Sequence, residues 1–576
     1  MAADGTIHET PRERVWKRAA HMERERALFE PLWRDLRDNF LPTRGRFDRD
    51  GDAQQRQPRR NSLPNSTPLY SVRTAASGLH AGLTSPARPW FKLSLRENSA
   101  AEFGPVKLWL STAEERLRQA FSGSNLYEML PFLYGEYAVF GTMAGACFED
   151  DTKRHVPFRF EWYTAGQYHL ATDAVGAYDT LYRDYTMTLR QVVGSFGLGK
   201  LGPTLRSQWE TGQYEARVKI RHTIEPAQNG RGWDSCYWEY SRNDKSEGLL
   251  AKRNITENPI LGAAWERMYG ETYGTSCPGI IALGDARALQ VDELDKARAI
   301  QRHHNPPLQG PPMVGKAGVS LLPGAYNEVA AMAIGPTAGI KSMYDFTPDI
   351  NGLIDNIRRG EKRIEQAFYS DLFLMLTMDD RAQRATAEEI RAKYDEKVLA
   401  LGPTLEQCNT MLRSLIDRAL GIMIRRSMPI WQGVQDGEPL LPAPPEELEE
   451  QDLDIEFIST LQQALRATTL QGIERFAAFA GQMAQFTGQP PDKFDAEQAL
   501  DEYAYGLGVP PTIVRDDESV AQMQASRAQQ QQMAQMAQMA PALRDGAQAA
   551  QSLGEAVPQD GSVLSAMAGA MGAPGL

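Results

Sequence analysis

Hydrophobic residues recur every three or four positions from residue 386 to 426, which places them on one face of a long α-helix. Thr386 and Glu389 form a capping-box pattern that predicts where this helix begins. Pro403 follows Gly402 and lacks a backbone N–H, so we expect the helix to break and kink there. The apolar positions are Ile390, Tyr394, Val398, Leu401, Leu405, Cys408, Leu412, Leu415, Ala419 and Met423. Periodicity by itself favours a long core helix of a globular enzyme.

The N-terminal part of the chain shows further helical patterns. Residues 11–41 predict one helix, which stops just before a proline. Residues 43–68 are basic and polar with two prolines, so we expect a loop. Residues 71–95 predict a helix, a turn and then an extended segment, and residues 105–146 hold two more helical patterns.

From residue 155 to 242 the hydrophobic period changes from helical to two. Apolar and polar residues alternate at 156–162 and again at 214–224, which predicts antiparallel strands with one face toward solvent. Asp173 and Gly176 supply turn chemistry between two of the strands. The chain is therefore predicted to be mainly α-helical with a β-rich insert, an α+β fold.

Two predicted helices of similar length, 284–304 and 349–373, flank a stretch rich in proline and glycine at 305–348. A helical hairpin with a long loop is the plain interpretation. A connection of this length is unusual for a simple loop, however, which suggests a fold or an interface of its own.

The C-terminal part divides into a linker, a folded piece and a tail. Residues 438–450 are proline-rich and acidic, and residues 452–486 predict a short strand that leads into an amphipathic helix. Alanine, glutamine and methionine dominate 519–543, a composition that favours helix. The Gly/Ala-rich end after residue 546 is predicted to be disordered.

The chain has 576 residues and a net charge of -12. The length allows about three or four domains. The negative charge argues against a generally basic nucleic-acid binder, because phosphate affinity needs clustered Lys and Arg. It does not exclude a protein that encloses DNA without gripping it.

Cysteine usage and apolar runs exclude other classes. The four cysteines lie far apart, so we interpret them as reduced core residues rather than a disulfide framework or zinc site. The N-terminus is charged and lacks the apolar stretch of a signal peptide. No apolar run is long enough to predict a membrane span.

No catalytic constellation emerges from the motifs. The segment 197–200 lacks the spacing and the Ser/Thr of a phosphate-binding loop. His303 and His304 are adjacent and so point to different sides of a helix, which makes a poor metal chelate. Asp379 and Asp380 have no identifiable partner carboxylates, which favours a loop role. We expect no catalytic residues, no cofactor and no metal ion.

Several short segments resemble one protein family. They are TAEEI, LGP and LIDRALGIM in the long helix, T-S-P followed by P-W-F-x-L at 84–93, and V-P-P at 509–511. In these short segments, and in their order along the sequence, the chain resembles the head-to-tail connector, or portal, proteins of short-tailed double-stranded DNA bacteriophages. Five patches agree between about residue 12 and 530.

The resemblance implies a ring of twelve copies at one capsid vertex, through whose channel DNA enters and leaves. It also implies a portal-like division of the subunit. The parts would be a wing (1–284, with its β-rich part at about 155–242), a first stem helix (285–304), a clip (305–348), a second stem helix (349–373), a channel loop with the long kinked helix (374–426), a crown (427–520) and a tail (521–576).

Two sets of residues would carry this function. The channel loop would contact passing DNA transiently, because its charges are mixed; its candidates are Met378, Asp379, Asp380, Arg381 and Arg384. The clip would present a weakly charged partner surface; its candidates are Met313, Val314, Leu321 and Leu322.

The partners implied are further copies of the chain, the major capsid and scaffolding proteins, the terminase large subunit, tail adaptor or tube proteins, and double-stranded DNA bound without sequence specificity. The protein would be made in the bacterial host cytoplasm and reside at the portal vertex of the virion. Proteins of the resembling family are not enzymes. The alternatives are a tail or adaptor component of the same virion, and an enzyme with a helical scaffold.

Overall fold

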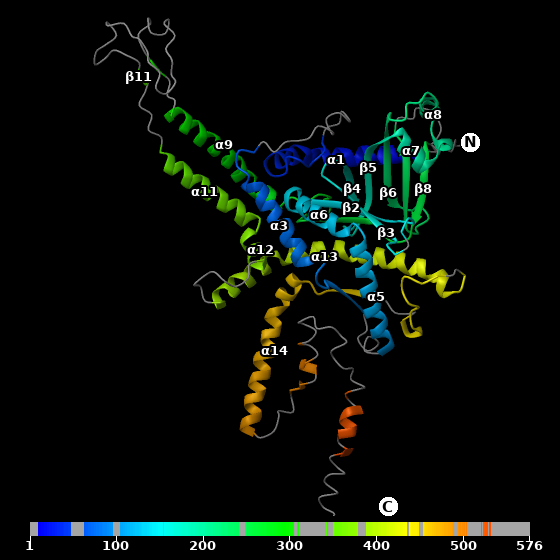
Figure 1. The fold of residues 1–576 in the computed structure, drawn as a ribbon, viewed down its shortest axis with the longest axis vertical. Helices are drawn as coiled ribbons and strands as arrows, with labels where there is room; N and C mark the ends of the chain where they lie inside the picture. The colour runs from blue at the N-terminus through cyan, green and yellow to red at the C-terminus, as the bar shows by residue number, and fades with distance from the viewer. Residues whose placement is uncertain are drawn as a thin grey trace, which may run out of the picture.

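The computed structural model describes most of the chain as helices and antiparallel sheets (Figure 1). The described residues are 10–47, 63–95, 104–153, 155–240, 248–304, 308–309, 341–342, 349–377, 387–434, 437–448, 453–487 and short stretches between 494 and 530. A body of helices and sheets carries one pair of helices, α9 and α11, that projects to one side, and a helix, α14, that points downward. The predicted α+β class is confirmed.

Helix α1 (Pro11–Phe40) confirms the first predicted helix. It begins at a capping box in which the Thr10 side chain accepts from the Glu13 backbone N–H, and Pro11 occupies the first turn. One side of the helix is buried on the five-stranded sheet through Val15, Ala19 and Met22.

The predicted helix, turn and strand at 71–95 are confirmed as α3 (Thr67–Leu83) and β1 (Phe91–Leu95). Strand β1 pairs antiparallel with β12 (Leu453–Phe457), far along the chain. This pairing joins the N-terminal part to the segment just before α14 (Thr460–Thr487).

Helices α5 (Gly104–Gly123) and α6 (Leu126–Phe140) confirm two helical patterns, but the second ends earlier than predicted. Gly141 adopts the left-handed conformation with φ of 73°, which closes α6. Residues 142–149 then form strand β2 rather than helix. The small and apolar residues of this strand suit a central position buried on both faces.

The β-rich part is built of two antiparallel sheets and extends beyond the predicted limit of 242. One sheet has the order β3-β2-β9 and the other β4-β5-β6-β7-β8. The strands are β2 (Thr142–Glu149), β3 (Phe158–Tyr163), β4 (Tyr168–Thr172), β5 (Tyr178–Thr188), β6 (Arg217–Pro226), β7 (Trp233–Glu239), β8 (Leu249–Ile255) and β9 (Ile260–Ala264). Two short α-helices and a 3-10 turn interrupt them: α7 (Leu189–Phe196), η1 (Leu198–Lys200) and α8 (Pro203–Glu210). The turn predicted at Asp173 is confirmed, with Gly176 at φ of 94°.

The prediction of one solvent face for this sheet is wrong. Beyond Ile220, strand β6 is buried at consecutive positions, including Arg221 and Thr223. Helix α1 covers the face that alternation assigned to water, with Trp16 placed 4.7 Å from the Arg221 guanidinium. Polar residues on this face are paired within the protein instead of being solvated: Arg221 pairs with Asp184 of β5, and Glu225 pairs with Arg14 and Arg18 of α1.

A pH dependence of stability follows from His169 beneath α1. Burial first, and then the Arg26 guanidinium 3.2 Å from its Nε2 atom, lower the pKa of His169 to about 3. Arg221 lowers this pKa further and Asp184 opposes the shift. As the pH falls below 6.5, His169 therefore binds a proton in the unfolded chain but stays neutral in the folded chain. The contribution of neutral His169 to the free energy of unfolding is complete above pH 6.5 and is lost as the pH falls toward 3.

We expect acidification from pH 7 to 5 to lower the thermal midpoint, with about 2 kcal/mol arising from His169. His169→Gln should flatten the slope of stability against pH. The matched control, His303→Gln at an exposed position, should leave the slope unchanged. Identical slopes for the wild type and His169→Gln would contradict the assignment.

The helices predicted at 284–304 and 349–373 are present, but the second is divided. Helix α9 spans Pro278–His304, α11 spans Ile350–Ala367 and α12 spans Ser370–Thr377. Tyr369 separates α11 from α12 with a φ of 54°, a strained conformation for a residue with a side chain. Phe368, Leu372 and Phe373, which lie on the two sides of this turn, are all buried.

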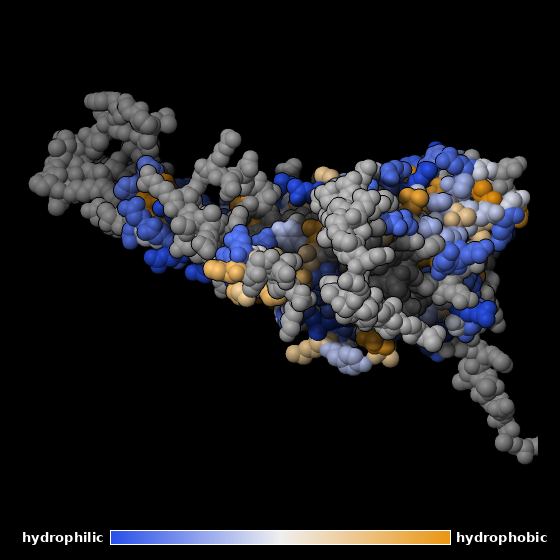
Figure 2. All heavy atoms as spheres, turned by 90° about the horizontal axis from the view of Figure 1, so that it is seen from below, coloured by the Kyte–Doolittle hydropathy of each residue, from blue (hydrophilic) through white to orange (hydrophobic). Residues whose placement is uncertain are grey.

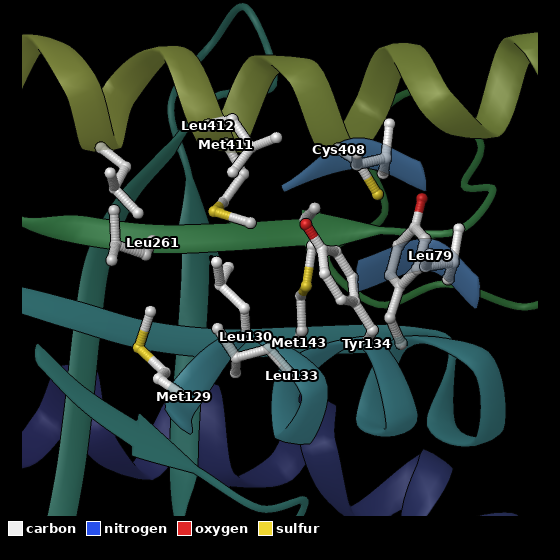
Figure 3. Close-up of a cluster of buried hydrophobic side chains, with 14 of the residues drawn as sticks. Leu79, Met129, Leu130, Leu133, Tyr134, Met143, Leu261, Cys408, Met411 and Leu412 are labelled. Carbon is white, nitrogen blue, oxygen red and sulfur yellow. The ribbon is translucent and has the colours of Figure 1, made fainter. Parts of the chain in front are cut away.

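The long helix α13 (Ala387–Trp431) runs through Gly402 and Pro403 without a break, so the predicted interruption is wrong, while a bend at these two residues stays a prediction. Thr386 lies outside the described residues. From Leu401 to Met423 the predicted apolar positions are all buried. They pack on α6 and on strands β2 and β9, together with Tyr134, Leu133 and Leu261 (Figure 3). Cys147, Cys236, Cys277 and Cys408 are free and buried, as predicted.

Candidate functional site

A projecting helix pair is the most distinctive feature of the fold. Helices α9 and α11 extend away from the body, and β10 (Leu308–Gln309) and β11 (Lys341–Ser342) pair antiparallel just beyond their ends (Figure 1). The chain therefore leaves along α9 and returns along α11 at the same place. The predicted partner-surface residues Met313, Val314, Leu321 and Leu322 lie outside the described residues.

The pair is held by one apolar seam with polar contacts at its edges. Helix α11 buries Ile357, Gly360 and Ile364, a spacing that makes one stripe facing α9. At the edges, Arg363 Nε donates to Asp285 at 2.8 Å and Asn356 Nδ2 donates to Asp292 at 2.6 Å. Seen from below, the projecting arm is mostly hydrophilic on its surface (Figure 2). These are the properties of a two-helix arm that stands in water.

The base of the arm is tied to the start of α3. Gln290 exchanges two hydrogen bonds with the backbone of Asn65, at 2.9 and 3.0 Å. The Asn65 side chain also donates to Glu361 at 2.8 Å, and Arg287 pairs with Asp35 of α1. Both helices of the arm are thus fixed to the body at one place.

The predicted channel-loop residues Met378, Asp379, Asp380, Arg381 and Arg384 lie outside the described residues. The elements on either side are described: α12 ends at Thr377 and α13 begins at Ala387.

Helix α12 lies directly against α3. A Cβ atom built on Gly78 would lie 2.5 Å from the Phe373 Cβ and closer still to its ring. Only glycine permits this approach. The close contact fixes α12, and with it the start of the predicted loop.

The far part of α13 is anchored by an ion-pair network that sequence reasoning missed. Arg418 is 1% exposed and reaches Glu257 at 2.5 Å and Glu149 at 3.3 Å. Arg425 pairs with the same two carboxylates, and Arg426 pairs with Asp151. The signal was available, because Arg418 interrupts the apolar run L-I-D-R-A-L-G-I-M.

The network determines the charge state of its members. Burial by itself would raise the pKa of Glu149, but the hydrogen bond from Arg425 and the charge of Arg418 lower this pKa overall. Gly421 faces Glu257 so closely that a Cβ atom would overlap the carboxylate. The network therefore needs both the arginines and a glycine on the same face of α13.

The described residues contain no group of three or more His, Cys, Asp or Glu side chains placed to hold a metal ion. His303 and His304 are exposed at the end of α9. Within the same part of the chain, no helix combines the length and apolarity that crossing a membrane requires. The distinctive features of the described residues are therefore the projecting two-helix arm and the long helix α13, which the ion-pair network anchors.

The family model "Bacteriophage head to tail connecting protein" matches residues 12–514. The chain is 37% identical to the "Portal protein" of Salmonella phage epsilon15, covering 98% of this chain and 99% of the relative. It is 34% identical to the "Probable portal protein" of Bordetella phage BPP-1, covering 95% and 96%.

The chain belongs to the bacteriophage head-to-tail connecting protein family, and its function is that of a phage portal. Portal proteins are virion components and structural connectors, not a known enzyme family.

Among solved structures, the chain is similar to one from the "Virion of native gene transfer agent (GTA) particle", with a TM-score of 0.35 and 14% identity over 74% of this chain and 91% of that chain. Another match comes from the "Neck of empty GTA particle computed with C6 symmetry", with a TM-score of 0.36 and 14% identity over 79% and 98%.

Proposed function

We propose that twelve copies of the chain form a ring at one capsid vertex, and that double-stranded DNA passes through its channel during packaging and ejection. The observation that carries this proposal is the family match over residues 12–514. A cyclic ring needs head-to-tail interfaces that close, so each copy presents two different complementary faces.

Helix α9 offers one such face. Ile281 and Val291 are 66% and 55% exposed, and nothing lies within 4 Å of a Cβ atom built on Gly284 between them. These three positions fall within about 80° of one another around the helix. In a ring, this small and apolar side would pack on the neighbouring subunit.

The proposed division of the subunit follows the chain. Residues 1–284 form the wing, residues 285–304 of α9 and residues 349–373 form the two stem helices, and residues 305–348 form the clip. Support for the stem comes from the antiparallel pairing of α9 with α11 and of β10 with β11, which brings both ends of the clip segment together. Residues 427–520 form the crown and 521–576 the tail.

In this arrangement the clip lies outside the capsid and binds the terminase large subunit during packaging and the tail adaptor or tube proteins afterwards. Met313, Val314, Leu321 and Leu322 would supply its apolar contacts. The wing contacts the major capsid and scaffolding proteins. The protein is made in the bacterial host cytoplasm and resides at the portal vertex.

The channel loop between α12 and α13 contacts the DNA. Asp379 and Asp380 repel phosphate, while Arg381 and Arg384 attract it. Mixed charge suits DNA that must move, because each strong phosphate contact would hinder sliding. The net charge of -12 per copy acts in the same direction.

Replacing residues 378–384 by a Gly/Ser linker tests the proposal. We expect native mass spectrometry and electron microscopy to show closed rings for both the wild type and the replacement. DNA packaging or retention should fall severalfold only in the replacement. The control replaces residues 435–436, beyond α13, by a Gly/Ser linker of the same two-residue length.

Only monomers or dimers of the wild-type protein, across salt and concentration, would contradict the ring. Normal packaging by the 378–384 replacement would contradict the loop assignment alone.

A further inference from the structure

A cavity of about 380 Å³ opens between the five-stranded sheet, helix α7 and the β2–β3 hairpin. The sheet and α7 that line it lie on the opposite side of the body from the projecting arm (Figure 1), and it shares only Glu149 and Arg418 with the network that anchors α13. Its volume is within the range of small-molecule sites. No part of the proposed portal function uses it.

One wall of the cavity is a row of rings in register across the sheet. Arg183, His222 and Tyr237 are direct cross-strand partners on β5, β6 and β7. The His222 and Tyr237 rings stack with centroids 4.1 Å apart, and Phe196 of α7 packs 5.3 Å from Tyr237. Phe196 and Tyr237 are both partly accessible. The wall therefore presents flat aromatic surface to the cavity.

The rest of the lining carries excess positive charge. Arg159 and Arg183 share a single carboxylate, Glu161, at 3.1 and 2.7 Å. Arg253 lies exposed at the mouth, and none of the described residues forms an ion pair with it. An uncompensated arginine at a cavity mouth attracts an anion.

The buried cation is already fixed in position. The Arg183 guanidinium lies 4.6 and 4.4 Å from the rings of Tyr163 and Tyr185, and its Nε donates to His222 Nδ1 at 3.3 Å. His222 Nε2 then lies 2.9 Å from Ser235 Oγ. The side chains behind the aromatic wall are therefore already ordered, so a ring that stacks on Tyr237 would require little further ordering of this wall, which favours affinity.

We propose that this cavity binds a small organic anion with a planar ring, of the nucleoside-phosphate class. The ring lies against Tyr237 and Phe196, and the phosphate faces Arg253 and Arg159. Aromatic stacking and arginine–phosphate hydrogen bonds are the two interactions that the lining supplies. The proposal does not depend on ring assembly or on DNA passage.

Isothermal titration calorimetry of the full-length protein with adenosine monophosphate tests it. We expect saturable binding, and we expect adenosine and inorganic phosphate to bind more weakly, each by about tenfold or more. If adenosine bound as tightly as the monophosphate, the proposed contact of the phosphate with the arginines would be overturned. Phosphate binding as tightly would overturn the ring site, and no saturation below about 10 mM monophosphate would overturn both.

Two variants on adjacent positions of β8 localise the binding. Arg253→Gln removes the cation at the mouth and should weaken monophosphate binding by about tenfold or more. Lys252→Gln makes the same change of charge, but Lys252 points to the opposite face of the strand, where it pairs with Asp234 at 2.8 Å. It should leave binding unchanged. Equal effects of the two substitutions would place the ligand elsewhere and overturn the proposal.

Discussion

Arg418→Met is expected to lower the free energy of unfolding by about 3 kcal/mol, the lower end of the range for breaking a buried ion pair. Arg418 is buried, and its two carboxylate partners come from different segments of the body: Glu149 ends strand β2, and Glu257 lies in the connection between β8 and β9. Methionine keeps most of the volume, so the loss is mainly electrostatic. The lower end applies because Arg425 still pairs with both carboxylates.

The control is Arg413→Met on the same helix. Arg413 pairs with Asp454, and both side chains are about half exposed. Exposed pairs contribute about 0–1 kcal/mol, so the control should change little. Denaturant unfolding followed by circular dichroism measures both variants. Equal destabilisation by the two substitutions would show that the buried network does not anchor α13.

Gly78→Ala is expected to cost about 3 kcal/mol, at the high end for overpacking of a core. The new methyl group would meet the Cβ and ring of Phe373, which is 2% exposed. Because the clash is with the root of the side chain and not its tip, rotation cannot relieve it. Helix α12 must move instead, and the start of the proposed channel loop moves with it.

Gly472→Ala is the matched control, since nothing lies within 4 Å of a Cβ atom at this helical glycine of α14. It should be neutral or stabilise by up to about 1 kcal/mol through helix propensity. Phe373→Leu in the Gly78→Ala background tests the mechanism. The double variant should lose less stability than the sum of the two single variants, and strict additivity would contradict a direct clash.

Elements with a strong local period could be predicted from the sequence. The apolar spacing from Leu401 to Met423 identified the buried face of α13, and the first helix was placed to within a residue at each end. Residue chemistry also identified the turn at Asp173 and the two helices that flank 305–348. The short motifs identified the family, which the match over residues 12–514 confirms.

The candidate site was predicted only in outline. The two-helix arm is confirmed as a structural element, whereas Met378–Arg384 and Met313–Leu322 stay predictions. The arginine network on α13 was missed, because its carboxylate partners lie more than 150 residues away in the sequence.

What the sequence by itself determined is local: the helical and strand periods, the caps and turns, and the family that they resemble. Tertiary structure decided which distant segments meet. Ser94 of β1 lies beside Asp454 of β12, 360 residues later. The residue pattern of neither strand predicts which strand it pairs with. Helix α1 buries polar residues such as Arg221 that alternation had assigned to water. Periodicity reports which side of an element is apolar, but the partner that covers the other side is set by long-range packing.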